Sequence, residues 1–116
     1  MSDVIIYHNP GCSTSRNALA LLRDKGLKPK VVEYLKTGWT KPQLEGLLKT
    51  MGVPARDILR TRGGRAEELG LTAPDVADAR IIAAMLDEPV LVERPIVTTS
   101  KGAVLCRPLE RLNEVL

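Results

Sequence analysis

Residues 4–26 read VIIYHNPGCSTSRNALALLRDKG, and this stretch decides the fold. The apolar residues 4–7 predict a short strand. Ser13 or Thr14 can cap a helix that follows and runs to about Lys25. The inner face of that helix carries Ala18, Leu19 and Leu22. A tight polar loop therefore joins a strand to a helix.

The next apolar run predicts a second strand over Lys30–Leu35. A strand, a helix and a strand in this order form a β-α-β unit, whose strands are parallel and whose crossover is right-handed. The chain therefore opens as a layered α/β domain.

The middle of the chain is predicted to be helical. Thr40 and Gln43 form a capping box, with Pro42 in the first turn. The apolar residues that follow at helical spacing are Leu44, Leu47, Leu48 and Met51. Residues 54–60 predict another short helix. Thr72 begins a further helix, whose inward residues are expected to be Val76, Ala79, Ala83 and Leu86.

The last part of the chain returns to strands. Residues 95–99 and 103–106 flank a turn that contains Gly102, which predicts an antiparallel hairpin. Pro108 begins a last helix. The order is β-α-β, then helices, then β-β-α, so we expect a mixed α/β sheet.

Composition limits the classes of function. With 116 residues the chain suits one domain, and its 44% hydrophobic and 27% charged residues are ordinary for a soluble protein. No apolar run reaches the ~20 residues of a membrane span, so we expect a cytoplasmic protein without membrane contact. A net charge of +3 and 3% aromatic residues disfavour direct nucleic-acid binding. One histidine and two distant cysteines make a poor metal site.

Cys12 lies where the free amides of the helix N-terminus favour a thiolate. Lowering a thiol pKa by two units takes about 2.7 kcal/mol, whereas a helix terminus supplies about 0.3–1 kcal/mol. Further donors are needed, and Ser15, His8 and arginines are the candidates. An inert buried cysteine is the alternative, which the polar surroundings of Cys12 disfavour. His8 either stabilises the thiolate or packs against its own strand.

Ser15 stands where a thioredoxin-type Cys-x-x-Cys pair would have its second cysteine. An external thiol must then complete any redox cycle, unless Cys106 reaches Cys12. Cys106 ends an apolar strand, and we expect it to pack as a small hydrophobic residue.

Four separated motifs carry a resemblance to a known family: residues 8–16, Arg60, residues 93–97 and residues 105–108. They resemble the glutaredoxin-dependent arsenate reductases, the ArsC family. This resemblance implies one thioredoxin-like domain over residues 1–116, with a helical insertion at about 40–88. It also implies a cis-proline after Arg94.

The resemblance further implies that Cys12 is the catalytic nucleophile that attacks arsenate. The residues matching the family's oxyanion-binding arginines are Arg60, Arg94 and Arg107. Glutathione would be the co-substrate and glutaredoxin the partner, with no tightly bound cofactor.

The arginines also have a physical argument. A guanidinium fork pairs with two oxygens of a tetrahedral anion in a geometry that lysine cannot copy. Apart from the motif match, Arg62 is as plausible as Arg60.

Two other classes of function remain open. One is a Spx-like redox-sensing regulator that binds RNA polymerase, but such proteins resemble one another in a Cys-x-x-Cys switch that Ser15 interrupts. The other is a monothiol oxidoreductase, which would need Cys12 but not Arg60 or Arg107.

Overall fold

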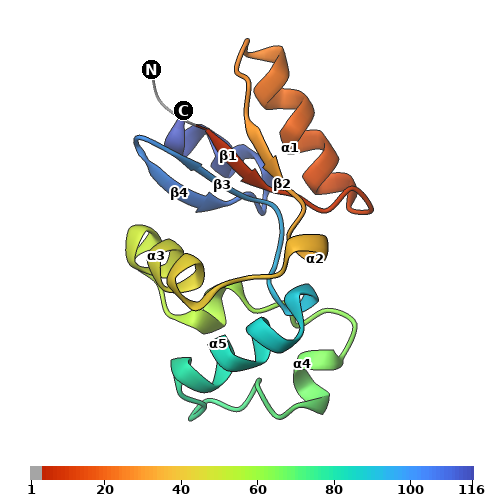
Figure 1. The fold of residues 1–116 in the computed structure, drawn as a ribbon, viewed down its shortest axis with the longest axis vertical. Helices are drawn as coiled ribbons and strands as arrows, with labels where there is room; N and C mark the ends of the chain where they lie inside the picture. Colours follow the sequence, from red (N-terminus) through yellow and green to blue (C-terminus); the bar gives the residue numbers. More distant parts are fainter. Residues whose placement is uncertain (1–3) are drawn as a thin grey trace. The chain divides into compact units, whose positions relative to one another are not determined.

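The computed structural model describes residues 4–116, which divide into two compact units. The first combines the described chain up to Thr37 with Arg94–Leu116, and the second is Gly38–Glu93. Figure 1 shows strands and a long helix in the first unit and mainly helices in the second. The second unit thus contains the whole segment in which the sequence predicted a helical insertion.

The first unit is built on a four-stranded sheet with the order β2-β1-β3-β4. Its strands are β1 (Ile5–Tyr7), β2 (Lys30–Val32), β3 (Ile96–Thr99) and β4 (Gly102–Leu105). Strand β1 pairs in parallel with β2 and antiparallel with β3, and β3 and β4 form a hairpin. The predicted β-α-β opening, the hairpin and the mixed sheet are confirmed.

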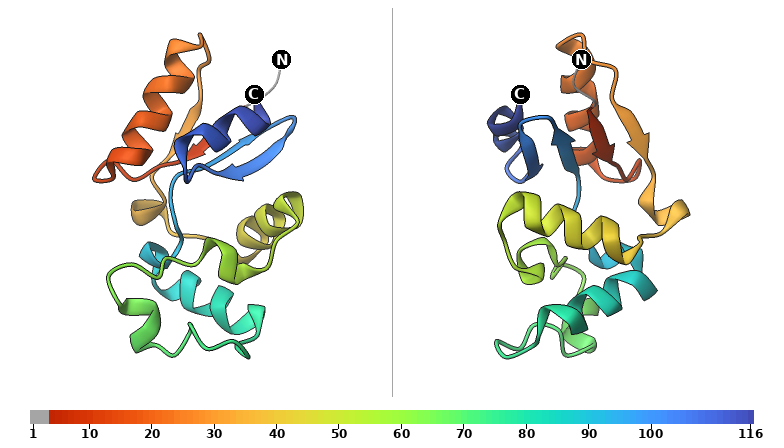
Figure 2. Two further views of the ribbon diagram at one scale, coloured as in Figure 1. Left: turned by 180° about the vertical axis from the view of Figure 1, so that it is seen from behind. Right: turned by 60° about the vertical axis from the view of Figure 1, so that its left-hand side comes forward.

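One face of this sheet is covered by α1 (Ser13–Asp24) and by the 3-10 helix η3 (Leu109–Val115). Figure 2 shows these two elements on the same side of the strands. The core between them consists of Val4, Ile6, Ala18, Leu22, Val97, Val104, Cys106, Leu112 and Val115. Because fully burying one large aliphatic side chain stabilises a protein by about 1.5–3 kcal/mol, this core holds α1 and η3 against the sheet.

Local boundaries differ from three of the expectations. The second strand ends at Val32, and α2 (Tyr34–Thr37) follows where strand was expected. Helix α1 has Cys12 at its N-cap, and no side-chain cap hydrogen bond forms there among the described residues. The prediction that Ser13 or Thr14 caps α1 was therefore wrong, since both residues lie inside the first turn. The last helix is a 3-10 helix.

The second unit contains α3 (Lys41–Met51), η1 (Ala55–Ile58), α4 (Arg65–Glu68), α5 (Asp78–Asp87) and η2 (Pro89–Leu91). The capping box of Thr40 and Gln43 is confirmed in both directions at the start of α3.

Helix α5 corrects the sequence analysis. It starts at Asp78 rather than Thr72, and its buried residues are Ile81, Ile82, Ala84 and Met85. The expected inward set of Val76, Ala79, Ala83 and Leu86 was wrong, because none of these is fully buried. Two stripes had helical spacing, and the stripe with the larger side chains is inside because it removes more apolar area from water.

Among residues 4–116, no helix is both long and apolar enough to span a lipid bilayer.

Candidate active site

The loop before α1 holds Cys12 through its backbone. The Cys12 amide donates to the Asn9 carbonyl at 3.0 Å, and the Arg16 amide donates to the Cys12 carbonyl at 3.0 Å. The Asn9 side chain accepts from the Gly11 amide at 2.9 Å, and Arg16 Nη1 donates to the Pro10 carbonyl at 2.7 Å. These bonds close a turn at the carboxyl end of β1 and leave the Cys12 sulfur over the first amides of α1.

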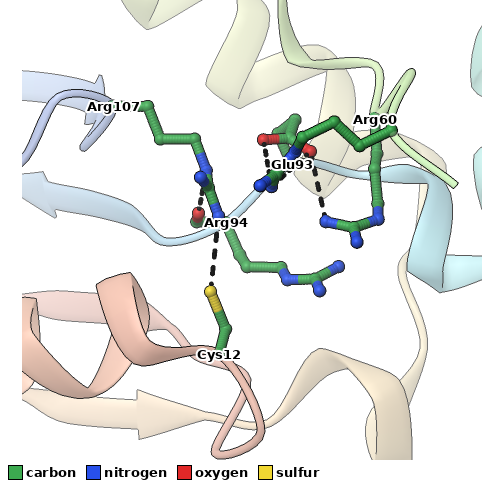
Figure 3. Close-up of polar contacts among 6 residues, drawn as sticks. Cys12, Arg60, Glu93, Arg94 and Arg107 are labelled. Atoms are coloured by element: carbon green, nitrogen blue, oxygen red, sulfur yellow. Dashed lines mark hydrogen bonds and ion pairs between the residues drawn. The ribbon is translucent and has the colours of Figure 1, made fainter.

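Two of the predicted arginines lie at this sulfur. Arg107 Nη2 donates to Cys12 Sγ at 3.3 Å, and Arg107 Nε donates to the Arg94 carbonyl at 2.7 Å. Figure 3 shows Arg107 joining Cys12 to the Arg94 backbone. The peptide bond between Arg94 and Pro95 is cis, as the family resemblance implied. One arginine therefore contacts the thiol and also fixes the backbone of the other.

The guanidinium of Arg94 has buried donors without partners. Within the described part of the chain, its Nε and Nη1 atoms are shielded from solvent and make no hydrogen bond. A buried donor left unsatisfied costs about 1–3 kcal/mol, and more when it is charged. An anion beside the Cys12 thiol would remove this cost.

The environment lowers the pKa of Cys12 below its ordinary value. Burial alone would raise this pKa, but the Ser15 backbone amide, a hydrogen bond from Arg94 and the charges of Arg107 and Arg94 outweigh burial. The sequence argument that the helix terminus needs additional donors is consistent with this balance, because two arginines supply the rest.

His8 and Ser15 act on the loop. His8 Nδ1 lies 2.6 Å from Ser15 Oγ, and Ser15 Oγ accepts from the Asn9 amide at 3.0 Å. Burial lowers the pKa of His8, with the charge of Glu33 acting against it. In a neutral His8 the unprotonated Nδ1 can accept a hydrogen bond from the Ser15 hydroxyl, and the Ser15 oxygen still accepts from the Asn9 amide. Within residues 4–116, His8 makes no hydrogen bond to Cys12.

Arg60 lies in the second unit, where it meets a carboxylate that the sequence analysis did not single out. Its Nη1 is 3.5 Å from Glu93 Oε1, and Arg62 Nη2 contacts both oxygens of Glu93 at 3.2 and 3.1 Å. Figure 3 labels Glu93 and Arg60. The position of Glu93 directly before Arg94 was visible in the sequence, but its pairing depends on a long-range contact between residues 60 and 93.

The second cysteine lies in the core of the first unit. Cys106 is fully buried among the apolar residues of that core, and burial raises its pKa to about 12. It therefore packs as a small hydrophobic residue, as expected. Among the described residues no group of three or more His, Cys, Asp or Glu side chains could hold a metal ion.

Comparisons with known proteins give one answer. The family model of the ArsC family matches residues 7–115. The chain is 50% identical over 113 residues to the arsenate reductase ArsI2 of Synechocystis sp., covering 97% of this chain and 81% of that protein. It is 45% identical over 116 residues to the arsenate reductase of Escherichia coli strain K12, covering 100% and 82%.

A comparison of structures also points to the arsenate reductases. The structure matches that of an arsenate reductase from Vibrio cholerae with a TM-score of 0.93 at 39% identity, covering 98% of each chain. The expected α/β fold of the thioredoxin-like class is confirmed.

Proposed function

The chain belongs to the ArsC family, and we propose that it reduces arsenate to arsenite with Cys12 as the nucleophile. The observation that carries this proposal is the arginine pair at the Cys12 sulfur. Arg107 contacts the sulfur, while two buried donors of Arg94 have no partner among the described residues. Relatives at 45–50% identity are named arsenate reductases.

The site suits a tetrahedral oxyanion. Guanidinium groups pair with its oxygens through charge-assisted hydrogen bonds, which are about twice as strong as neutral ones. The same groups stabilise the charge that develops on those oxygens during displacement. Arg94 and Arg107 would bind the anion beside the sulfur, and Arg60 would be the third ligand.

In the first step the Cys12 thiolate attacks arsenic. A sulfur–arsenic bond forms, and one arsenate oxygen leaves as water, carrying the protons of the anion and one from solvent. The lowered pKa of Cys12 increases the fraction of the thiol that is present as the nucleophilic thiolate. The product is a cysteinyl-arsenate.

Two external thiols complete the reduction. The glutathione thiolate attacks arsenic and displaces a second oxygen as water. The glutaredoxin thiolate then attacks the glutathione sulfur, so that a disulfide forms and the electron pair of the sulfur–arsenic bond stays on arsenic, which becomes As(III). Water hydrolyses the remaining bond to Cys12 and releases arsenite. In sum, arsenate and two thiols give arsenite, one disulfide and one water.

Within the described residues, the chain itself offers no second thiol that could take part in these reaction steps. Ser15 has a hydroxyl where a resolving cysteine would be, and Cys106 is buried with a raised pKa. Glutathione is therefore a co-substrate, glutaredoxin is the protein partner, and no tightly bound cofactor is needed. This chemistry and its glutathione-rich setting favour a cytoplasmic location.

The test is arsenate-dependent NADPH oxidation in the presence of glutathione, glutaredoxin and glutathione reductase. We expect Cys12→Ser to lose the activity down to the protein-free rate, and Cys106→Ser to retain it within about twofold. A wild-type rate no higher than the protein-free rate would overturn the proposal. If the chain instead removes glutathione from a glutathionylated protein, at a rate that arsenate does not change, it is a monothiol oxidoreductase.

A further inference from the structure

Arg16 is an exposed residue of α1 that holds the loop before this helix. Its Nη1 atom donates to the Pro10 carbonyl at 2.7 Å, a short distance that is typical of hydrogen bonds from a charged donor. Its backbone amide donates to the Cys12 carbonyl at 3.0 Å. One residue of α1 therefore binds two carbonyls of the loop, one on each side of Gly11.

The helix itself does not explain the charge of Arg16. An α-helix has a partial positive charge at its N-terminus, which favours anions there by about 0.3–1 kcal/mol and disfavours cations. Arg16 follows the first turn of α1, which contains no acidic side chain that could pair with it. The guanidinium instead has its partner in the loop, at the Pro10 carbonyl. The role of Arg16 therefore lies in the loop.

This loop forms a compact turn that contains Cys12. The Cys12 amide donates to the Asn9 carbonyl at 3.0 Å, and the Gly11 amide donates to Asn9 Oδ1 at 2.9 Å. Both bonds lie within residues 9–12, so they fix the shape of the turn but not its position relative to α1. That position depends on bonds between the turn and the helix.

Two side chains of α1 join the turn to the helix. Ser15 Oγ accepts from the Asn9 amide at 3.0 Å, and Arg16 Nη1 donates to the Pro10 carbonyl at 2.7 Å. The Ser15 backbone amide is also one of the donors that lower the pKa of Cys12. Because a hydrogen bond weakens as its distance and angle depart from the optimum, a small displacement of the turn would weaken the bond from the Ser15 amide to the sulfur.

We propose that Arg16 is a positioning residue for the reaction of Cys12: it holds the Pro10 carbonyl against α1 and thereby keeps the Cys12 sulfur at the first amides of the helix. Among the described residues Arg16 makes no hydrogen bond to that sulfur. Its charge is also not among the influences that lower the pKa of Cys12, so it acts through the loop. The inference rests on the proposed function, in which Cys12 is the nucleophile.

Arg16→Met removes the charge and the donor but keeps an unbranched side chain. We expect the pKa of Cys12 to rise by about half a unit, which lowers the thiolate fraction below that pKa about threefold. The kcat of arsenate reduction should fall at least about threefold, because the nucleophile is less ionised and less well aligned. The KM for arsenate should stay within about twofold of wild type, because Arg94 and Arg107 are unchanged. Thiolate absorbance through a pH titration and steady-state kinetics measure these values.

Arg23→Met is the matched control. Arg23 is exposed about two turns further along α1, and its charge lowers the pKa of His8 as that of Arg16 does. In the described part of the chain it makes no hydrogen bond to residues 9–12. We expect an unchanged Cys12 pKa and a kcat within about twofold of wild type. Arg16→Lys keeps a charged donor but loses the fork, so its values should lie between those of wild type and Arg16→Met.

Asn9→Ala loosens the same turn without a change of charge. It removes the acceptor of the Gly11 amide, so the Cys12 pKa should rise as in Arg16→Met. Amide hydrogen exchange, followed by NMR, reports on the loop itself. The Cys12 amide is bonded to the Asn9 carbonyl and should exchange about fivefold faster in both variants, while amides in the later turns of α1 keep their wild-type rates.

Three results would overturn the inference. Equal shifts of the Cys12 pKa in Arg16→Met and Arg23→Met would assign the effect to net charge. A raised KM with an unchanged kcat in Arg16→Met would make Arg16 an anion ligand. A Cys12 pKa that does not change in Arg16→Met would show that the turn keeps its position without this side chain.

The pH titration and the exchange measurement need no arsenate, so the two levels of proposal fail differently. If the wild-type protein does not reduce arsenate, the proposed function is wrong, and these two measurements still decide whether Arg16 positions Cys12. If the wild-type protein reduces arsenate but Arg16→Met leaves the Cys12 pKa and amide exchange unchanged, only the inference is wrong.

Discussion

The first unit contains two buried cysteines whose sulfur atoms lie in opposite environments. Cys12 is 9% exposed and Cys106 is 0% exposed, so both count as buried. The pKa of Cys12 is nevertheless lowered, and that of Cys106 is raised to about 12. The difference comes from what surrounds each sulfur: a helix terminus and two arginines in one case, and aliphatic side chains in the other.

The comparison teaches that hydrogen-bond donors offset desolvation at Cys12. Burial disfavours the thiolate at both positions, and at Cys12 it is still the largest single influence. Donors that point at the sulfur reverse the sign of the net shift. A reactive cysteine can therefore be partly shielded from water, provided that enough donors are fixed around it.

The largest expected effect is a difference in alkylation between the two thiols. The thiolate fraction at a given pH falls tenfold for each unit of pKa, and the two values lie on either side of the ordinary value of 9.0. We expect iodoacetamide to modify Cys12 at least about a thousandfold faster than Cys106 in the folded protein. Peptide mass spectrometry after timed quenching measures both rates in one sample.

The pH dependence of this reaction has a definite sign. A lowered pKa means that the Cys12 rate reaches half of its maximum below pH 9.0, the ordinary thiol value, and falls as the pH drops through the lowered pKa. A Cys12 rate that reaches half of its maximum only at or above pH 9.0 contradicts the assignment. Unfolding in denaturant is the control, because both thiols should then react at similar rates.

How far the sequence predicted this site can be judged from particular residues. The order of strand, loop and helix predicted where Cys12 lies, because the apolar patterns of neighbouring elements are local properties of the chain. The motifs around Arg94 and Arg107 identified both side chains that meet the thiol. The pairing of Glu93 with Arg62 could not be predicted, since it depends on a long-range bridge formed by Leu59 and Val92.

The wrong sequence predictions also result from long-range contacts. For α5, two apolar stripes had helical spacing, and packing against α3, η1 and η2 decides which one is buried. Residues after Val32 continue the apolar pattern of a strand, yet they turn into α2. Single-segment periodicity cannot distinguish such cases, because tertiary contacts override weak local preferences.

The next largest effect is expected from Arg107, because it contacts the sulfur of Cys12 and does not influence the pKa of Cys106. Removing its contact with the Cys12 sulfur removes a hydrogen bond and a positive charge, so Arg107→Ala should raise the Cys12 pKa by about one unit. The ultraviolet absorbance of the thiolate, followed through a pH titration, measures this shift. The Cys106 pKa should not change, because Arg107 does not contribute to it.

Arg111→Ala is the matched control for Arg107→Ala. Arg111 pairs with Glu114 on the exposed surface of η3, so its loss changes the net charge equally without touching Cys12. We expect an unchanged Cys12 pKa in this variant. Equal shifts in both arginine variants would show that net charge, rather than the contact of Arg107 with sulfur, lowers the pKa.

The smallest expected effect concerns His8, and it tests whether Cys12 needs a third cation. Burial lowers the pKa of His8, and His8 Nδ1 contacts Ser15 Oγ at 2.6 Å. A neutral ring that accepts from Ser15 contributes position rather than charge. His8→Gln keeps an acceptor, so the Cys12 pKa should change by less than about half a unit. A nearby cation stabilises a thiolate, so a rise of about one unit would instead assign a charged His8 to the site.

Ser15→Ala distinguishes a role of His8 in positioning the loop from a role as a charge. The substitution removes the acceptor of the Asn9 amide and should loosen the loop, while it leaves the histidine in place.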